Sequence, residues 1–177
     1  MVNDLLRLVL DHLDTKTSCP IIVSGSVGSG KSETSRVVAE CLESEGYEPG
    51  GVLSPRLVDS GETVGYDVVD LATGTRRSFV RSSPPGKRVG RFFIKPRAVE
   101  FSNEAISEAI GKRNPVFVDE VGRLELKNDG LAPSIRKLLT SETQAILLVR
   151  SEFLPGVRSY FEIREYDEVR IENDELN

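Results

Sequence analysis

Hydrophobic residues in this chain follow two kinds of pattern that alternate along the sequence. Short apolar runs of about five residues, bounded by turn-forming residues, are typical of strands that a parallel sheet buries on both faces. Segments in which apolar residues recur every three or four positions are typical of helices with one buried face. The runs lie at 20–24, 115–121 and 144–150, and the helical segments at 5–13, 31–45, 99–110 and 131–142. Their alternation predicts an α/β fold with a mainly parallel sheet and helices on both faces.

A different pattern interrupts this alternation in the middle of the chain. Residues 63–81 alternate apolar and polar side chains around a Thr-Gly turn, which predicts an inserted antiparallel β-hairpin. The remaining expectations are a strand over 50–58 that breaks near Pro55, a loop over 82–88, and strands over 159–163 and 168–171.

The first 19 residues are predicted to form a helical extension of a single domain that spans residues 1–177. Asn3 or Asp4 is expected to cap this helix, because their side chains accept hydrogen bonds from N–H groups of the first turn. The apolar face of the helix, from Leu5 to Leu13, has two possible partners, the body of the domain or a second copy of the chain.

The composition fits a globular protein, with 38% hydrophobic and 29% charged residues. The longest apolar stretches are far shorter than the roughly 20 residues that cross a bilayer, and acids interrupt the apolar start of the chain. Cys19 and Cys41 form no Cys-x-x-Cys pair and His12 is the sole histidine, which argues against a zinc site or a disulfide framework. We therefore interpret these three residues as structural and expect a cytoplasmic protein with no membrane contact.

A phosphate-binding signature follows the first apolar run. It reads Gly25-Ser26-Val27-Gly28-Ser29-Gly30-Lys31-Ser32 and satisfies G-x-x-x-x-G-K-[ST] between a predicted strand and a predicted helix. Glycines allow successive backbone N–H groups to point at a phosphate, and the helix that begins at Lys31 adds its positive end. In this motif Lys31 reaches the β- and γ-phosphates and the Ser32 hydroxyl ligates Mg²⁺. The motif predicts a P-loop NTPase fold and a nucleoside triphosphate ligand.

A second candidate element is the pair Asp119 and Glu120, which directly follows the apolar run "PVFV". A carboxylate at the end of a buried strand needs a partner, and in P-loop enzymes that partner is Mg²⁺. We therefore predict Asp119 as a metal residue and Glu120 as the general base that polarises the attacking water. The string "DEVG" also matches a GTPase switch element, but the chain lacks N-K-x-D for guanine.

Positive charge is concentrated in one segment, although the net charge of -5 argues against bulk nucleic-acid affinity. Residues 71–99 contain no acid and form what we call the basic island: Arg76, Arg77, Arg81, Lys87, Arg88, Arg91, Lys95 and Arg97. Three interpretations stay open. The island is a solvated surface, or Arg88 and Arg91 stabilise the triphosphate as an internal arginine finger does, or it binds RNA with stacking from Phe79, Phe92 and Phe93.

Together these strings resemble the THEP-type nucleoside-triphosphatases, also called cancer-related NTPases. The segment "DEVGRLEL" (119–126) is similar to a family segment, and "VGYDVVDLATG" (64–74) and "GKRVGRFFI" (86–94) match further family strings in order. The resemblance implies Mg²⁺-dependent hydrolysis of ATP, GTP, CTP or UTP with loose base preference, and nucleotide contacts by Gly122 and Arg123. The chain departs from the family in its extension 1–19, in the segment 150–159, and in a closing "END" (172–174) that has no Arg.

Two other functions use the same residues. A nucleoside or nucleotide kinase would pass the phosphoryl group to an acceptor instead of water, and a nucleotide-switched module would use slow hydrolysis to time a contact with RNA or protein. The pair Asp119-Glu120 favours water as the acceptor. The sequence leaves the oligomeric state and the role of nucleic acid open.

Overall fold

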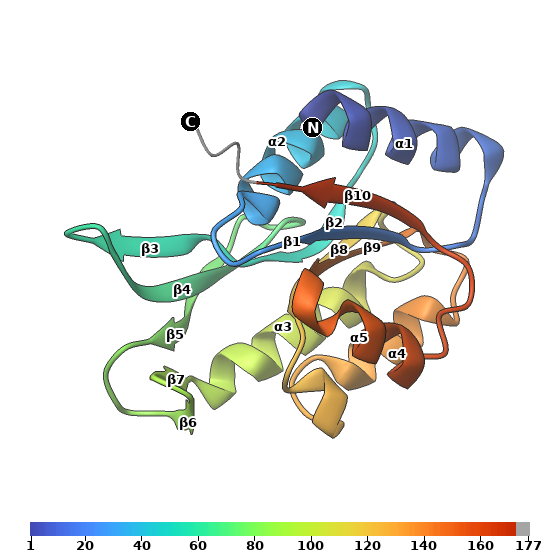
Figure 1. The fold of residues 1–177 in the computed structure, drawn as a ribbon. Coiled ribbons are helices and arrows are strands. Elements are labelled where there is room, and N and C mark those ends of the chain that lie inside the picture. The colour runs from blue at the N-terminus through green and yellow to red at the C-terminus, as the bar shows by residue number, and fades with distance from the viewer. Residues whose placement is uncertain (173–177) are drawn as a thin grey trace.

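The computed structural model of the chain describes residues 1–172 and contains one large mixed sheet covered by helices on both faces (Figure 1). The helices are α1 (Val2–Thr15), α2 (Lys31–Ser44), α3 (Pro96–Ala109), α4 (Ala132–Leu139) and α5 (Leu154–Tyr160). The strands are β1 (Ile21–Gly25), β2 (Gly50–Leu53), β3 (Arg56–Asp59), β4 (Glu62–Asp70), β5 (Arg76–Arg81), β6 (Lys87–Val89), β7 (Phe92–Ile94), β8 (Val116–Val121), β9 (Ala145–Arg150) and β10 (Asp167–Ile171). The predicted α/β fold is confirmed.

Five parallel strands in the order β10-β1-β9-β8-β2 form the core of the sheet. Because the strands run in one direction, their carboxyl ends meet at one edge. The register places Gly25, the last residue of β1, between Arg150 of β9 and Ile171 of β10. This edge therefore gathers the ends of three strands around the start of the phosphate-binding segment.

Side chains of each core strand point alternately to the two helical layers. Ile21 and Val23 pack in the cluster that contains α1 and α2, whereas Ile22 packs in the cluster that contains α3, α4 and α5. Phe117 of β8 is fully buried on the α1/α2 face. Figure 1 shows α1 and α2 above the sheet and the other three helices below it. This arrangement explains why the core strands are apolar throughout rather than alternating.

The antiparallel part of the sheet is larger than the single hairpin expected from the sequence. The β4–β5 hairpin is present, but β3 pairs with β4 on one side and the hairpin β6–β7 extends the sheet beyond β5. The expected loop 82–88 therefore ends early, since Lys87 and Arg88 belong to β6. Strands of three residues around the Gly90 turn are too short to give a readable alternation.

The expected strand at 159–163 is wrong, because helix α5 occupies residues 154–160. Val157 is buried in the core, and Leu154 and Phe161 pack against the same cluster three and four residues away. That spacing belongs to a helix, and Pro155 in its first turn has no N–H to lose there. Asn173 and Asp174 of the closing "END" lie outside the described residues.

Helix α1 begins at Val2 with Met1 at the cap position, so Asn3 and Asp4 lie inside its first turn and the expected cap is also wrong. Asp4 lies inside the first turn, where its carboxylate pairs with the Met1 amino group at 2.7 Å. Leu5 and Val9 are fully buried, and α1 packs on α2. None of the helices in residues 1–172 combines the length and apolar character that crossing a bilayer requires.

Candidate active site

The phosphate-binding loop joins the end of β1 to the start of α2. Gly28 and Gly30 have φ values of 76° and 93°, in the left-handed region that other residues avoid. This backbone turns N–H groups toward a cavity of about 300 Å³ that residues 27–32 line. Within the described chain, the Ser29 hydroxyl is buried here without a hydrogen-bond partner. The loop thus presents donors to a ligand that carries many acceptor oxygens.

Lys31 lies folded over the loop. Its Nζ donates to the carbonyl oxygen of Gly25 at 3.0 Å and to that of Ser26 at 2.8 Å. Burial lowers the pKa of Lys31, while the charges of Asp119 and Glu120 oppose that shift. Phosphate oxygens are stronger acceptors for an ammonium group than peptide carbonyls. The side chain can therefore exchange these two contacts for a bound phosphate.

Ser32 and Asp119, the two predicted metal residues, are in direct contact. The Ser32 hydroxyl donates to Asp119 Oδ2 at 2.6 Å, and the Ser54 N–H donates to the same oxygen at 2.8 Å. Asp119 is only 2% exposed, and its burial, followed by the charge of Glu120, raises the pKa of Asp119 to about 7. A hydroxyl and a carboxylate beside a phosphate cavity are the hard oxygen donors that suit Mg²⁺. These residues fit a divalent metal.

Glu120 has an unusual backbone that aims its side chain into the same cavity. Its φ is 59°, and the β8–β9 pairing shifts register between Val118 and Val121. Such bulges re-aim side chains beside active sites, and strained non-glycine residues cluster there. Glu120 Oε2 accepts a hydrogen bond from Arg150 Nη2 at 3.1 Å. An acid and a guanidinium group therefore form one wall of the cavity.

Several residues of this cavity were not predicted from the sequence, among them Arg56, Tyr66 and Arg150. Arg56 reaches over the loop: a Cβ atom, if Gly28 had one, would lie 2.7 Å from Arg56 Nη1. Arg150 had a readable signal, because it ends the apolar run of β9 as Asp119 nears the end of β8, and parallel strands end at one edge. Arg56 and Tyr66 had no local signal.

A second cavity, of about 240 Å³, adjoins the first and shares Tyr66, Glu120 and Arg150 with it. The loop after β8 lines it, and this loop is braced by Glu125, a buried carboxylate that accepts from the N–H groups of Gly122 and Leu131. Its apolar lining includes Phe79, Val89, Phe92, Ile94 and Val121, and its polar lining includes Arg91, Gly122 and Arg123. Glu120 and Arg150 thus stand between two cavities.

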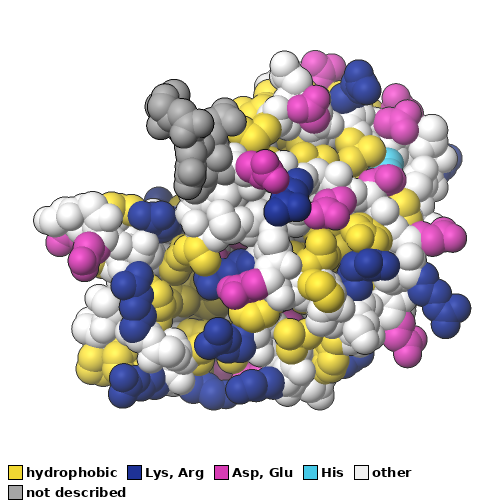
Figure 2. Space-filling view, in the orientation of Figure 1, with side chains coloured by type: hydrophobic (Ala, Val, Ile, Leu, Met, Phe, Trp, Pro, Cys, Tyr) yellow, Lys and Arg dark blue, Asp and Glu magenta, His cyan; other side chains and the backbone are white. Residues whose placement is uncertain are grey.

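The structure separates the members of the basic island. Arg76 and Arg81 pair with Asp67 of β4, and Lys87 pairs with Asp129, so acids from outside the island neutralise part of it. Figure 2 shows Lys and Arg side chains over this end of the molecule, around a hollow with hydrophobic side chains in it.

The two proposed finger residues differ in position. Arg91 lies over the Phe92 ring and lines the second cavity. Arg88 donates through Nε to the Gly90 carbonyl at 3.2 Å, and it is not among the described residues that line either cavity. Among the described residues, the arginines that line the phosphate-binding cavity are Arg36, Arg56 and Arg150.

Comparison with known proteins agrees with this geometry. The model of a family described as NTPase matches residues 20–175. This chain belongs to that NTPase family. It is 34% identical over 129 residues to the nucleoside-triphosphatase THEP1 of Methanopyrus kandleri, covering 73% of this chain and 72% of that protein. The corresponding THEP1 of Methanothermobacter thermautotrophicus is 29% identical over 147 residues, 82% of this chain and 84% of the relative. The predicted THEP-type resemblance is confirmed, and the match begins after α1.

Two solved structures share the fold of this NTPase-family chain. The crystal structure of THEP1 from Aquifex aeolicus has a TM-score of 0.69 at 16% identity and covers 89% of this chain and 92% of its own. The solution structure of a human cancer-related nucleoside triphosphatase has a TM-score of 0.66 at 22% identity, with coverage of 86% and 88%. These likenesses confirm the predicted P-loop NTPase architecture with a mostly parallel core.

Proposed function

We propose that this chain hydrolyses nucleoside triphosphates to diphosphate and phosphate, with Mg²⁺ as the cofactor and loose base preference. The observation that carries the proposal is the 2.6 Å contact between Ser32 and Asp119 beside the phosphate-binding loop, with Glu120 next along β8. Membership of the NTPase family supports the reaction type.

Binding of the triphosphate begins with the loop. Its N–H groups and the amino end of α2 cradle the phosphates. Lys31 leaves the carbonyls of Gly25 and Ser26 and contacts the β- and γ-phosphate oxygens. The negative charge of these oxygens stabilises the ammonium group, which burial otherwise disfavours. Lys31 therefore serves both the bound substrate and the transition state.

Ser32 and Asp119 would hold the metal. The Ser32 hydroxyl would be a direct ligand, and Asp119 would bind in its carboxylate form, either directly or through a water of the metal shell. When bound, Mg²⁺ neutralises charge on the β- and γ-phosphate oxygens. The N–H group of Ser54, the residue after β2, fixes the Asp119 carboxylate in place.

Glu120 orients and deprotonates the attacking water. Before substrate binds, Arg150 holds Glu120 Oε2 at 3.1 Å. A γ-phosphate competes with Glu120 for this guanidinium group, because bidentate pairing with phosphate is stronger than one hydrogen bond to a partly buried carboxylate. Arg150 then stabilises charge on the transferring group, and Glu120 is released to act as the base.

The test is phosphate release from ATP, GTP, CTP and UTP with Mg²⁺ and no second substrate. We expect turnover of all four nucleotides, with equal amounts of nucleoside diphosphate and free phosphate. Activity should be lost when EDTA removes the metal. Diphosphate formation that requires an added acceptor would contradict hydrolysis. Activity that persists in EDTA would contradict the roles of Ser32 and Asp119.

The second cavity favours one alternative, phosphoryl transfer to a bound acceptor. It lies on the far side of Glu120 and Arg150 from the phosphate-binding loop, where an acceptor hydroxyl could take the place of the attacking water. Its aromatic and aliphatic lining suits the flat ring of an acceptor, such as the base of a nucleoside. A transferase would form diphosphate without an equal amount of free phosphate in the presence of its acceptor. Val89→Phe, which fills the cavity, would abolish transfer and leave hydrolysis intact.

A further inference from the structure

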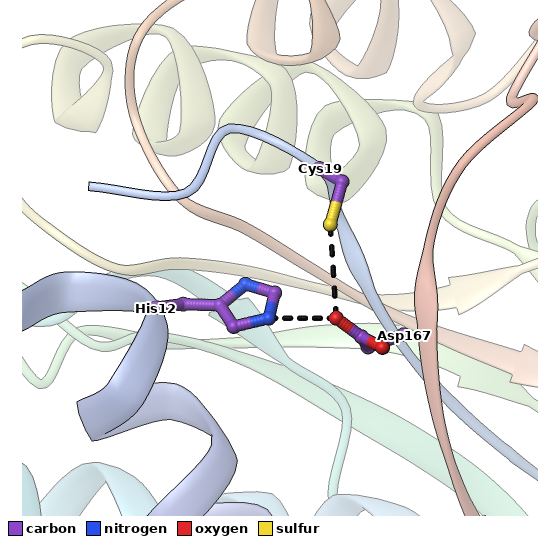
Figure 3. A group of neighbouring side chains, drawn as sticks. All are labelled: His12, Cys19 and Asp167. Atoms are coloured by element: carbon purple, nitrogen blue, oxygen red, sulfur yellow. Dashed lines mark hydrogen bonds and ion pairs between the residues drawn. The ribbon is translucent and has the colours of Figure 1, made fainter. Parts of the chain in front are cut away.

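A cluster of three potential metal ligands lies at the opposite end of the parallel strands from the phosphate-binding loop. His12 comes from the last turn of α1, Cys19 from the segment before β1, and Asp167 is the first residue of β10. Figure 3 shows the imidazole and the thiol both directed at the Asp167 carboxylate. Their donor atoms all lie within 4.8 Å of one another.

Gln144 determines which nitrogen of His12 faces this cluster. Its Nε2 donates to the carbonyl oxygens of Cys19 at 3.1 Å and Ala145 at 3.0 Å, so the amide can only present Oε1 to the imidazole. His12 Nδ1 lies 3.2 Å from this Oε1 and must carry a proton to donate. In neutral histidine the other nitrogen, Nε2, is then a bare lone pair.

That lone pair faces another acceptor. His12 Nε2 lies 2.8 Å from Asp167 Oδ2, a distance at which two acceptors repel unless a cation stands between them. The same arrangement, with Nδ1–H held by an oxygen acceptor and Nε2 free, is the one that metal-binding histidines adopt.

We propose that His12 Nε2, Cys19 Sγ and Asp167 Oδ2 form a site for Zn²⁺. Tetrahedral zinc with ordinary bond lengths separates nitrogen and oxygen ligands by about 3.3 Å and sulfur and oxygen ligands by about 3.6 Å. The observed separations are 2.8 Å between Nε2 and Oδ2 and 3.7 Å between Sγ and Oδ2. The third separation, between Nε2 and Sγ, is at most 4.8 Å, whereas tetrahedral zinc requires about 3.6 Å. The site forms when Asp167, which is half exposed, and Cys19 shift toward the metal, and water supplies the fourth ligand.

The charges around the cluster favour a cation. Burial, followed by the charge of Asp167, raises the pKa of the Cys19 thiol, and Glu165 adds to the shift. Glu162 and the opposing Arg164 line the adjoining surface hollow. Zn²⁺ binds the thiolate and the neutral imidazole, so binding displaces the thiol proton. The site would tie α1 to β10, two elements far apart in sequence.

This inference differs from the sequence expectation, which argued against a zinc site because no Cys-x-x-Cys or His cluster is present. The three donors are separated by up to 155 residues, so they form no local sequence motif. Only the packing of α1 across the start of β1 and β10 brings them together.

The experiment titrates the full chain with Zn²⁺ in saturating Mg²⁺, which occupies the site beside the phosphate-binding loop. Co²⁺ serves as the spectroscopic probe, because a cobalt–thiolate bond gives a charge-transfer band in the near ultraviolet. We expect one tight metal per chain, the cobalt band, and a rise in Tm of about 5–10 °C when zinc exceeds its Kd by about 100-fold. Failure to detect saturable zinc binding or the cobalt band in the wild type would overturn the proposal.

Cys41 provides a matched control, since it is the other free cysteine and lies in α2 away from the cluster. Cys19→Ser should lose the cobalt band, whereas Cys41→Ser should keep it. Asp167→Asn and Gln144→Ala should weaken zinc at least tenfold, the latter through loss of imidazole orientation. A band that survives Cys19→Ser, or disappears in Cys41→Ser, would overturn the assignment. If Cys19→Ser fails to fold, Asp167→Asn replaces it as the test, and unchanged zinc affinity in Asp167→Asn would overturn the assignment.

Discussion

Replacement of Arg150 by alanine is expected to reduce catalysis strongly and stability only slightly. The Arg150–Glu120 pair joins side chains that are 32% and 26% exposed, at 3.1 Å between Nη2 and Oε2. Pairs with this exposure contribute at most about 1 kcal/mol to folding, which corresponds to about 2–4 °C in Tm for a chain of this size. The same guanidinium group on a transferring phosphoryl group contributes about 10³–10⁵ in kcat, or about 4–7 kcal/mol.

The assay compares kcat, KM and Tm for wild type, Arg150→Ala and Arg150→Lys. We expect kcat to fall about 10³- to 10⁵-fold in Arg150→Ala while Tm falls by no more than about 4 °C. Lysine should restore part of the rate, because it keeps the charge but loses the planar fork. Arg88→Ala is the matched control and should keep wild-type turnover, since Arg88 does not line the cavity. A kcat within a few-fold of wild type in Arg150→Ala would refute the reasoning.

Three other changes test separate parts of the account. Lys31→Ala should weaken binding of a non-hydrolysable nucleotide and abolish turnover together, as calorimetry and phosphate release would measure. Because burial raises the pKa of Asp119 to about 7, the Mg²⁺ concentration for half-maximal hydrolysis should rise up to about tenfold per pH unit below pH 7, and Asp119→Asn should remove this dependence. The same raised pKa means that metal-free protein is stabilised at acid pH and loses that stability as pH rises from about 4 through 7, which urea titrations can follow. Phe117→Ala removes a fully buried side chain and should cost about 3–5 kcal/mol of unfolding free energy.

The parts of the site that sequence analysis predicts are those encoded locally. Strand, glycine loop and helix are consecutive, so residues 25–32 identify both a structure and a ligand class. Asp119 is predictable because a carboxylate at the end of an apolar strand requires a partner. The structure places it 2.6 Å from Ser32, although 87 residues separate them.

The parts that sequence analysis misses depend on pairing between distant strands. Arg150 enters the site because β9 pairs with β1 in a register that sets Arg150 beside Gly25. Arg56 reaches the loop from β3, a short strand at the antiparallel end of the sheet. Arg88 and Arg91 were candidates because the sequence shows an acid-free segment around them. The positions of their side chains depend on contacts of the β6–β7 hairpin, and the spacing of residues does not reveal these contacts. The misread strand at 159–163 has the same origin, because a short apolar segment fits either a strand or a helix.

Glu120→Gln tests the central claim most directly. Glutamine keeps the shape of the side chain and one acceptor oxygen, but it cannot take a proton from water. The measurement pairs single-turnover hydrolysis of Mg²⁺·ATP with the affinity for a non-hydrolysable analogue. We predict unchanged nucleotide and Mg²⁺ affinity with hydrolysis slowed about 10²- to 10⁴-fold, which excess Mg²⁺ does not rescue. Hydrolysis within a few-fold of wild type would contradict the account and place the base elsewhere.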